Sequence, residues 1–170
     1  SESVNISDQY WELWNLVFIQ NNRIEDGSLM DLPAKHVDTG AGFERIVSVL
    51  QNRTSNYATD LFMPIIQKVE NLTGKSYQDN PVPFQVIADH IRMLSFSIAD
   101  GSMPGNEGRG YVLRRILRRA ARFGRMLDQH QPCIYNLTDI VGEIMGDFFP
   151  EVVEKRAHIE KVVKAEESSF

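Results

Sequence analysis

Two glycines, an acid and an arginine follow one another closely between His36 and Arg45. Gly40 and Gly42 lie one residue apart at a predicted junction of strand and helix, where glycine lets a ligand approach the backbone. The start of a helix offers unpaired N–H groups and the positive end of its dipole, which both favour an anion. Arg45 lies on the first turn and could hold a phosphate with two hydrogen bonds, while Asp38 could hold an ammonium group.

The same residues also allow a purely structural interpretation. Glycines at a junction of strand and helix serve the backbone more often than a ligand, and Asp38 could simply cap the turn before Gly40. A dinucleotide-binding turn would need a third glycine and a following strand, and neither is present in the expected place. A P-loop is excluded because no lysine followed by serine or threonine comes after these glycines.

Arginine is concentrated on one segment, although the chain as a whole is acidic. The net charge is −5, yet Gly108 to Leu127 contains seven arginines and no acid. Spacings of three and four residues would align them along a helix, and such a row could follow the backbone of an RNA duplex. Alternatively, about half of them pair with acids on neighbouring helices, such as Glu143, Asp147 or Glu151. The six arginines on the predicted helix are Arg114, Arg115, Arg118, Arg119, Arg122 and Arg125.

A glycine-rich loop, residues 101–110, precedes this helix and contains Asn106 and Arg109. An amide side chain both donates and accepts hydrogen bonds, and the minor groove of A-form RNA is shallow enough for a side chain to reach the bases. On residue type alone, Asn106 is better interpreted as a turn residue than as a base-reading one.

The elements that must position these residues change in character along the chain. Alternation and β-branched content predict a strand over Trp11–Gln20, with short strands over Leu29–Leu32 and His36–Thr39. Because the first strand is apolar on both faces, we expect it to be a central, covered one. From Gly42 onward the apolar period becomes helical, which predicts an amphipathic helix with Phe43 at its start.

Only helical patterns follow. We expect a helix over Pro64–Leu72 that Gly74 stops, a loop over Tyr77–Pro83, and a helix over Ile87–Ile98. The remaining predicted helices span about Tyr111–Met126, about Tyr135–Phe149, and from near Pro150 toward the C-terminus. The predicted class is α+β, mainly helical: a short antiparallel β part over residues 1–52, followed by a helical bundle over residues 53–170. Both ends of the chain look cut.

Composition limits the remaining function classes. A hydrophobic content of 42% with 24% charged residues predicts a soluble globular protein, and no apolar run is long enough to cross a membrane. With one cysteine and scattered histidines, no zinc or other metal site is predicted. Asp89 and His90 are adjacent on a helix, where side chains point about 100° apart, so we do not expect them to converge. The single Cys133 suits a reducing, cytoplasmic location.

Several stretches resemble the alanyl-tRNA synthetases, in the order of that family. Residues 36–45, His-Val-Asp-Thr-Gly-Ala-Gly-Phe-Glu-Arg, match Gly-x-Gly-x-x-Arg, the third signature motif of class II synthetases. The other matching stretches are residues 12–18, 55–57, 87–92 and 108–115. Ala41 and Phe43 stand where the family often has Met and Leu, which are conservative differences.

The resemblance implies an alanine site and an ATP site. Asp38 would receive the α-ammonium of alanine, Gly40 would lie beneath its methyl group, and Asn15 and Val17 would contact it from one strand face. Gly42 and Arg45 would bind ATP, with Arg45 on the γ-phosphate. Glu12 and Asn15 resemble a pair near the magnesium ion that accompanies ATP, but on a flat strand they would face oppositely.

A tRNA site follows from the same resemblance. Asn106 matches the asparagine that reads the G·U pair of the tRNA(Ala) acceptor stem, together with an aspartate that lies beyond residue 170. The arginines expected to contact the tRNA are Arg109, Arg114, Arg115, Arg118 and Arg122.

The implied activity is alanine–tRNA ligation in the cytoplasm. Alanine is activated with ATP and transferred to the 3′ end of tRNA, and the remainder of the synthetase chain is a required partner. The first two class II motifs lie upstream in the family, so this chain alone is expected to be inactive. The alternatives are a free-standing helical RNA-binding module with a vestigial nucleotide site, and a phosphoryl-transfer enzyme.

Overall fold

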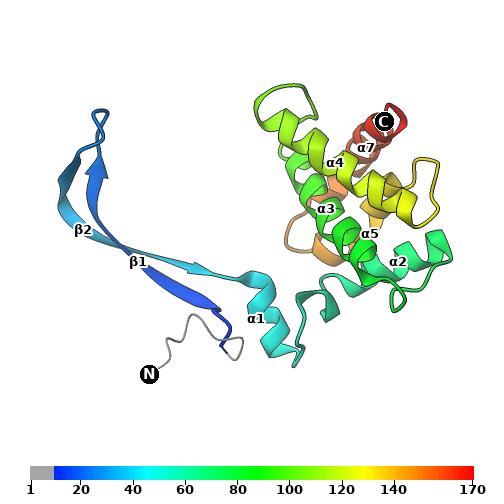
Figure 1. Cartoon of the computed structure of the whole chain (residues 1–170), viewed down its shortest axis with the longest axis horizontal. Coiled ribbons are helices and arrows are strands. Elements are labelled where there is room, and N and C mark those ends of the chain that lie inside the picture. The colour runs from blue at the N-terminus through cyan, green and yellow to red at the C-terminus, as the bar shows by residue number, and fades with distance from the viewer. Residues whose placement is uncertain (1–9) are drawn as a thin grey trace. The chain divides into compact units, whose positions relative to one another are not determined.

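The structure, a computed structural model, describes residues 10–170. The chain divides into two compact units, and the boundary in the sequence falls between Asn56 and Tyr57. Figure 1 shows a long β-ribbon and one helix in the first unit and a helical bundle in the second. The predicted class, α+β and mainly helical, is confirmed. No helix within residues 10–170 has the length and apolar character that a bilayer crossing requires.

The ribbon consists of two antiparallel strands, β1 (Trp14–Arg23) and β2 (Leu29–Ala41). Gly27, at φ 84°, allows the tight connection between them, and the Asp26 carboxylate accepts hydrogen bonds from the backbone N–H and the hydroxyl of Ser28. The left-handed conformation at this position suits glycine.

The two short strands predicted over residues 29–32 and 36–39 are in fact parts of one strand. Their apparent separation comes from an irregularity in register: Ile19 pairs with His36, but Asn21 pairs with Asp31, so residues 32–35 lie opposite Gln20. Pro33, which has no N–H to donate, falls in this bulge.

The expectation that the first strand is covered on both faces is wrong for this structure. Trp14 and Phe18 are 65% and 68% exposed on one face, and Val17 is 47% exposed on the other. A strand that is apolar on both faces is expected to be covered on both. In this ribbon of two strands, no further strand or helix in the described part of the first unit covers either face.

Helix α1 (Phe43–Leu50) follows β2 directly, as the apolar period predicts. Its buried residue is Ser48, whose hydroxyl donates to the Glu44 carbonyl at 2.9 Å and to Asn56 Oδ1 at 3.0 Å.

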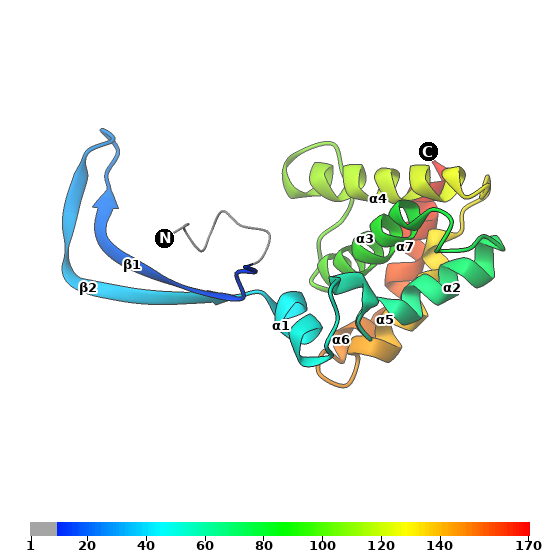
Figure 2. The ribbon, with the colours of Figure 1, turned by 60° about the horizontal axis from the view of Figure 1, so that its bottom comes forward.

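In the second unit, a central helix, α3 (Pro81–Ala99), contacts all five of the other α-helices. They are α2 (Met63–Thr73), α4 (Gly108–Met126), α5 (Thr138–Met145), α6 (Glu151–Glu154) and α7 (Arg156–Ser168). Phe84, Ile91 and Leu94 are fully buried on α3 because neighbours cover it on several sides. Helices α4 and α7 both contact α3 and also contact each other, and Figure 2 shows α4 beside α3.

Helix boundaries differ from the predicted ones where proline and glycine lie inside first turns. Pro81 opens α3 rather than belonging to a loop, since the N–H groups of a first helical turn have no partner to lose. Gly108, at φ 54°, begins α4 three residues before the predicted Tyr111. Gly74, at φ 66°, ends α2 as predicted.

The two last predicted helices are both interrupted. The helix expected over residues 135–149 is a short 3-10 turn (Ile134–Leu137) followed by α5, which ends at Met145. The C-terminal helix breaks at Lys155, between α6 and α7. There the Lys155 ammonium donates to the Ala99 carbonyl at the end of α3, at 2.6 Å.

A buried carboxylate ties α7 to the 3-10 turn. Glu167 is 8% exposed and accepts backbone hydrogen bonds from Cys133, Ile134 and Tyr135 at 3.0–3.2 Å. Burial raises the pKa of Glu167, and the three hydrogen bonds oppose that rise.

We predict that Glu167 makes stability depend on pH. The pKa of Glu167 in the folded state lies above the ordinary glutamate value of 4.5. The contribution of Glu167 to the unfolding free energy is therefore complete below pH 4.5 and is lost as the pH rises through the folded-state pKa. The unfolding free energy of wild type minus that of Glu167→Gln should therefore fall over this window, measured by urea denaturation. A matched Glu154→Gln change at an exposed position should give a flat difference. A flat difference for Glu167→Gln as well would contradict the assignment.

Candidate functional site

The register of the ribbon gathers the four predicted alanine-site residues on one face. Asn15 pairs with Gly40, and Val17 pairs with Asp38. Directly paired residues of an antiparallel sheet share a face, as do residues two apart on one strand. Sequence reasoning had placed Asn15 and Val17 together; the register adds Asp38 and Gly40 across from them.

Gly40 keeps space open beside the Asn15 amide. A Cβ atom at Gly40 would lie 3.1 Å from Asn15 Oδ1, closer than most side-chain contacts allow. The amide would then have to move. The side chain of Asn15 thus lies directly over the backbone of Gly40, at the point where the small residue is needed.

Glu12 and Asn15 come together rather than facing oppositely. The Asn15 amide nitrogen donates to Glu12 Oε1 at 3.2 Å. The prediction was wrong because the strand begins at Trp14, not Trp11, so Glu12 precedes the pleated part and is not bound by its alternation.

Arg45 connects the first turn of α1 to the segment that leads into β1. Its Nη1 donates to the Glu12 carbonyl at 2.8 Å, and its guanidinium lies 5.9 Å from the centre of the Trp11 ring. Gly42 makes room for this arrangement: a Cβ there would lie 3.2 Å from Arg45 Cδ. The Gly42 N–H also donates to the Leu13 carbonyl at 2.9 Å. Glu12 thereby links two side chains: its carboxylate accepts from the Asn15 amide, and its backbone carbonyl accepts from the Arg45 guanidinium.

Trp11, Trp14 and Thr39 are site-adjacent residues that sequence reasoning did not single out. The Trp14 indole N–H donates to the Thr39 hydroxyl, which itself donates to the Asn15 carbonyl at 3.0 Å. This chain of bonds lies on the opposite face of the ribbon and joins the two strands at the pair that holds Asn15. No spacing rule could have revealed it, because the partners are 25 residues apart.

In the helical unit, Asn106 lies on a loop that closes tightly on the first turn of α4. The Gly105 N–H donates to the Gly110 carbonyl at 2.9 Å. A Cβ at Gly110 would lie 2.6 Å from the Met103 carbonyl oxygen, so only glycine fits there without a shift of backbone. The exposed Asn106 side chain accepts a hydrogen bond from Arg114 Nη1 through its Oδ1.

The arginines of α4 divide into an inner and an outer set. Arg114 and Arg118 each donate through Nε to the same oxygen of Glu166, at 2.9 and 3.1 Å. The expected partners Glu143, Asp147 and Glu151 were wrong, because it is α7 whose acid faces this side of α4. Glu166 is 8% exposed, so this carboxylate is a buried anchor for the inner set.

The outer set is exposed. Arg115, Arg119 and Arg122 lie three and four residues apart on the side of α4 away from its buried residues Leu113 and Leu117. Within residues 10–170, no carboxylate lies within ion-pair distance of Arg115 or Arg122. Arg109, which α4 carries in its first turn, is exposed as well.

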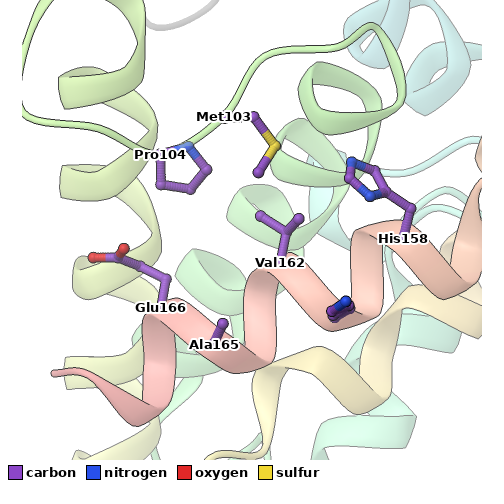
Figure 3. A pocket seen from close by; sticks show the side chains of 7 residues that line it. Met103, Pro104, His158, Val162, Ala165 and Glu166 are labelled. Carbon is purple, nitrogen blue, oxygen red and sulfur yellow. The ribbon is translucent and has the colours of Figure 1, made fainter.

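A groove runs between the Asn106 loop and α7. Its volume is about 420 Å³, and Met103, Pro104 and Val162 form its apolar walls. Figure 3 shows Met103 and Pro104 above α7, with His158 toward one end of the groove and Glu166 toward the other. The carboxylate that anchors Arg114 thus lies beneath the loop that carries Asn106.

Asp89 and His90 do interact, contrary to expectation. His90 Nδ1 lies 3.0 Å from Asp89 Oδ2. The hydrogen bond with His90 holds the pKa of Asp89 below its usual range. Among the described residues, no three His, Cys, Asp or Glu side chains group in a way that could hold a metal ion.

Known proteins match this chain along its whole length. The family model of the class II tRNA synthetases (A) matches residues 1–170. The chain belongs to this family. The class II synthetase resemblance in its motifs is thereby confirmed.

Relatives carry the name alanine–tRNA ligase. The protein of Chlorobaculum tepidum is 53% identical over 98% of this chain, that of Halalkalibacterium halodurans 54% over 96%, and that of Bacillus subtilis 52% over 96%. The chain spans 19–20% of the length of these synthetases.

We predict that the loop depends on the absence of a side chain at Gly110. Gly110→Ala should lower the unfolding free energy by about 1–3 kcal/mol, because its Cβ overlaps the Met103 carbonyl and backbone must move. Thermal denaturation measures this effect. Gly124→Ala on the same helix is the matched control: its Cβ would meet Cys133 Sγ and Ile134 Cδ1 at an ordinary 3.7 Å, so it should be neutral or stabilising. Equal effects of the two changes would rule out the steric explanation.

Proposed function

We propose that the full-length protein is an alanine–tRNA ligase of the cytoplasm, to which residues 1–52 contribute one wall of the aminoacylation site and residues 53–170 a tRNA-recognition domain. The whole-chain family match and the names of the relatives support the enzyme class. The observation that carries the site assignment is the register that brings Asn15, Val17, Asp38 and Gly40 onto one face.

This face has the chemistry that a small amino acid requires. The Asp38 carboxylate pairs with the α-ammonium, while the Asn15 amide offers a hydrogen bond to the substrate. Val17 supplies apolar contact, and Gly40 leaves room for a methyl group. A site of this kind discriminates poorly between side chains that differ by one methylene, which is worth about 1–3 kcal/mol.

The ATP phosphates are proposed to bind beside this face, at Glu12, Gly42 and Arg45. Arg45 has five N–H donors and is seen to use one of them on the Glu12 carbonyl, which leaves others for a γ-phosphate. Gly42 allows close approach to the backbone at the start of α1. Glu12 fits as one oxygen ligand of a Mg²⁺ ion that the ATP phosphates hold for the rest, and the ion would supply charge neutralisation.

The reaction then depends on positioning. A carboxylate oxygen of alanine attacks the α-phosphorus in line; the α–β phosphoanhydride bond breaks and pyrophosphate leaves. The 3′-terminal hydroxyl of the tRNA next attacks the alanyl carbonyl and AMP leaves. Asp38 and Arg45 hold the two reactants at either end, so that they meet in the required geometry.

The tRNA acceptor stem fits the second unit. Asn106 is proposed to read the G·U pair in the minor groove, and the exposed Arg109, Arg115 and Arg122 to contact phosphates. Arg114 and Arg118 are predicted RNA contacts as well, but because each donates its Nε to Glu166 we propose an internal role for both instead. Residues 1–170 alone are proposed to lack aminoacylation activity, since the exposed two-stranded ribbon needs the remainder of the synthetase to cover it.

We predict that Asp38→Asn lowers kcat/KM for alanine by about 10- to 100-fold in the full-length protein, because it removes a charge-assisted bond to the ammonium. Alanine-dependent pyrophosphate exchange measures this, and the KM for ATP should change little. Asp31→Asn is the matched control: this acid lies on the same strand, where its carboxylate accepts from Asn21, away from the proposed site. An alanine KM unchanged by Asp38→Asn would refute the ammonium assignment.

We predict that the outer arginines set the salt dependence of tRNA binding. Arg122→Gln should reduce the slope of log K against log salt concentration by up to about 0.9, the value for one phosphate contact. Arg118→Gln removes the same charge from the inner set, and its slope should stay close to wild type. Filter binding over a range of salt concentrations measures both. Equal reductions for the two variants would contradict the division of α4 into inner and outer sets.

A further inference from the structure

The orientation of the Asn106 amide is determined by its neighbour on α4. Arg114 Nη1 and Asn106 Oδ1 form a hydrogen bond. A guanidinium only donates, so the oxygen of the amide must face Arg114 and the nitrogen is left for another partner. An exposed asparagine in a loop would otherwise rotate freely about its last side-chain torsion.

Arg114 is itself held from the other side. Its Nε donates to Glu166 Oε1 at 2.9 Å, and the side chain is 24% exposed, against 9% for that of Glu166. Arg118, one turn further along α4, binds the same carboxylate oxygen at 3.1 Å. This carboxylate, largely out of water, accepts from two guanidinium groups and so holds both in a narrow range of positions.

The loop is fixed at its base by separate contacts. Its backbone closes through the Gly105–Gly110 hydrogen bond, and Met103 and Pro104 lie over α7 along the groove that ends at Glu166. Thus the backbone beneath Asn106 is set by α4 and α7, while its side chain is set by Arg114. Three elements converge on one amide.

We propose that Arg114, anchored by Glu166, is a positioning residue that orients the Asn106 amide for reading the acceptor stem. This inference rests on the proposed role of Asn106. Arg114 acts through Asn106, since its Nε is engaged by Glu166 and its Nη1 by the Asn106 amide. The neighbouring Arg115, exposed on the outer side of α4, has the phosphate-facing role instead.

A double-mutant cycle in the full-length protein tests this. Asn106→Ala, Arg114→Gln and the combined variant are compared by kcat/KM for tRNA(Ala) transcripts with G·U or G·C in the acceptor stem. Arg114→Gln should lower the G·U to G·C ratio by about tenfold, toward that of Asn106→Ala. The combined variant should be no less selective than Asn106→Ala alone, because the two residues act through one group.

Arg115→Gln is the matched control, an adjacent arginine with no contact to Asn106. It should lower kcat/KM for both transcripts by the same factor and leave the G·U to G·C ratio unchanged. If Arg114 had only an electrostatic or structural role, Arg114→Gln would give this same result. Glu166→Gln should lower the ratio in the same direction as Arg114→Gln, and it provides the test if the Arg114 variant fails to fold.

Two results would overturn the positioning role while leaving the proposed function intact. One is a wild-type ratio for both Arg114→Gln and Glu166→Gln while Asn106→Ala has lost selectivity. The other is a combined variant whose loss equals the product of the single losses. If Asn106→Ala keeps the wild-type ratio, the reading role of Asn106 fails, and the positioning role fails with it.

Discussion

The antiparallel pairing of β1 with β2 determines which side chains can meet in the first unit. Because side chains alternate along a strand, a slip of one residue would move Asn15 and Val17 to the face opposite Asp38 and Gly40. The bonds that join Trp14, Thr39 and the Asn15 carbonyl hold the register at that point. The bond from Arg45 to the Glu12 carbonyl then places the start of α1 against the same end of the ribbon. The proposed alanine and phosphate sites thus depend on one pairing.

Two consecutive glutamates on α7 have a comparable role in the second unit. Glu166 binds the inner arginines of α4, and Glu167 accepts three N–H groups from the 3-10 turn that precedes α5. Adjacent residues on a helix point about 100° apart, so one turn of α7 can hold two different neighbours. Both carboxylates are buried, which makes each bond strong and each unpaired group costly. Positive charge on α4 is therefore partly structural, and the exposed remainder is proposed to bind a polyanion.

Much of this arrangement could be predicted from the sequence, and the failures have physical causes. In the second unit, periodicity identified helices because their apolar faces pack on α3, and Gly74 ended α2 because its left-handed conformation suits glycine. It could not show that Arg114 and Arg118 share Glu166, since contacts across 48 and 52 residues leave no local pattern. For the ribbon, the sequence pattern led to a wrong prediction. Its first strand is apolar on both faces, which predicted a covered strand, whereas a two-stranded sheet leaves both faces exposed.

We propose that this chain supplies one wall of a site that activates alanine. Amino-acid-dependent exchange of labelled pyrophosphate into ATP by the full-length protein, measured with each of the standard amino acids in turn, tests it most directly. We expect the highest kcat/KM with alanine, measurable but weaker exchange with glycine and serine, and background rates with amino acids that have large side chains. Exchange driven best by a larger or charged amino acid, or no exchange with alanine, would contradict it.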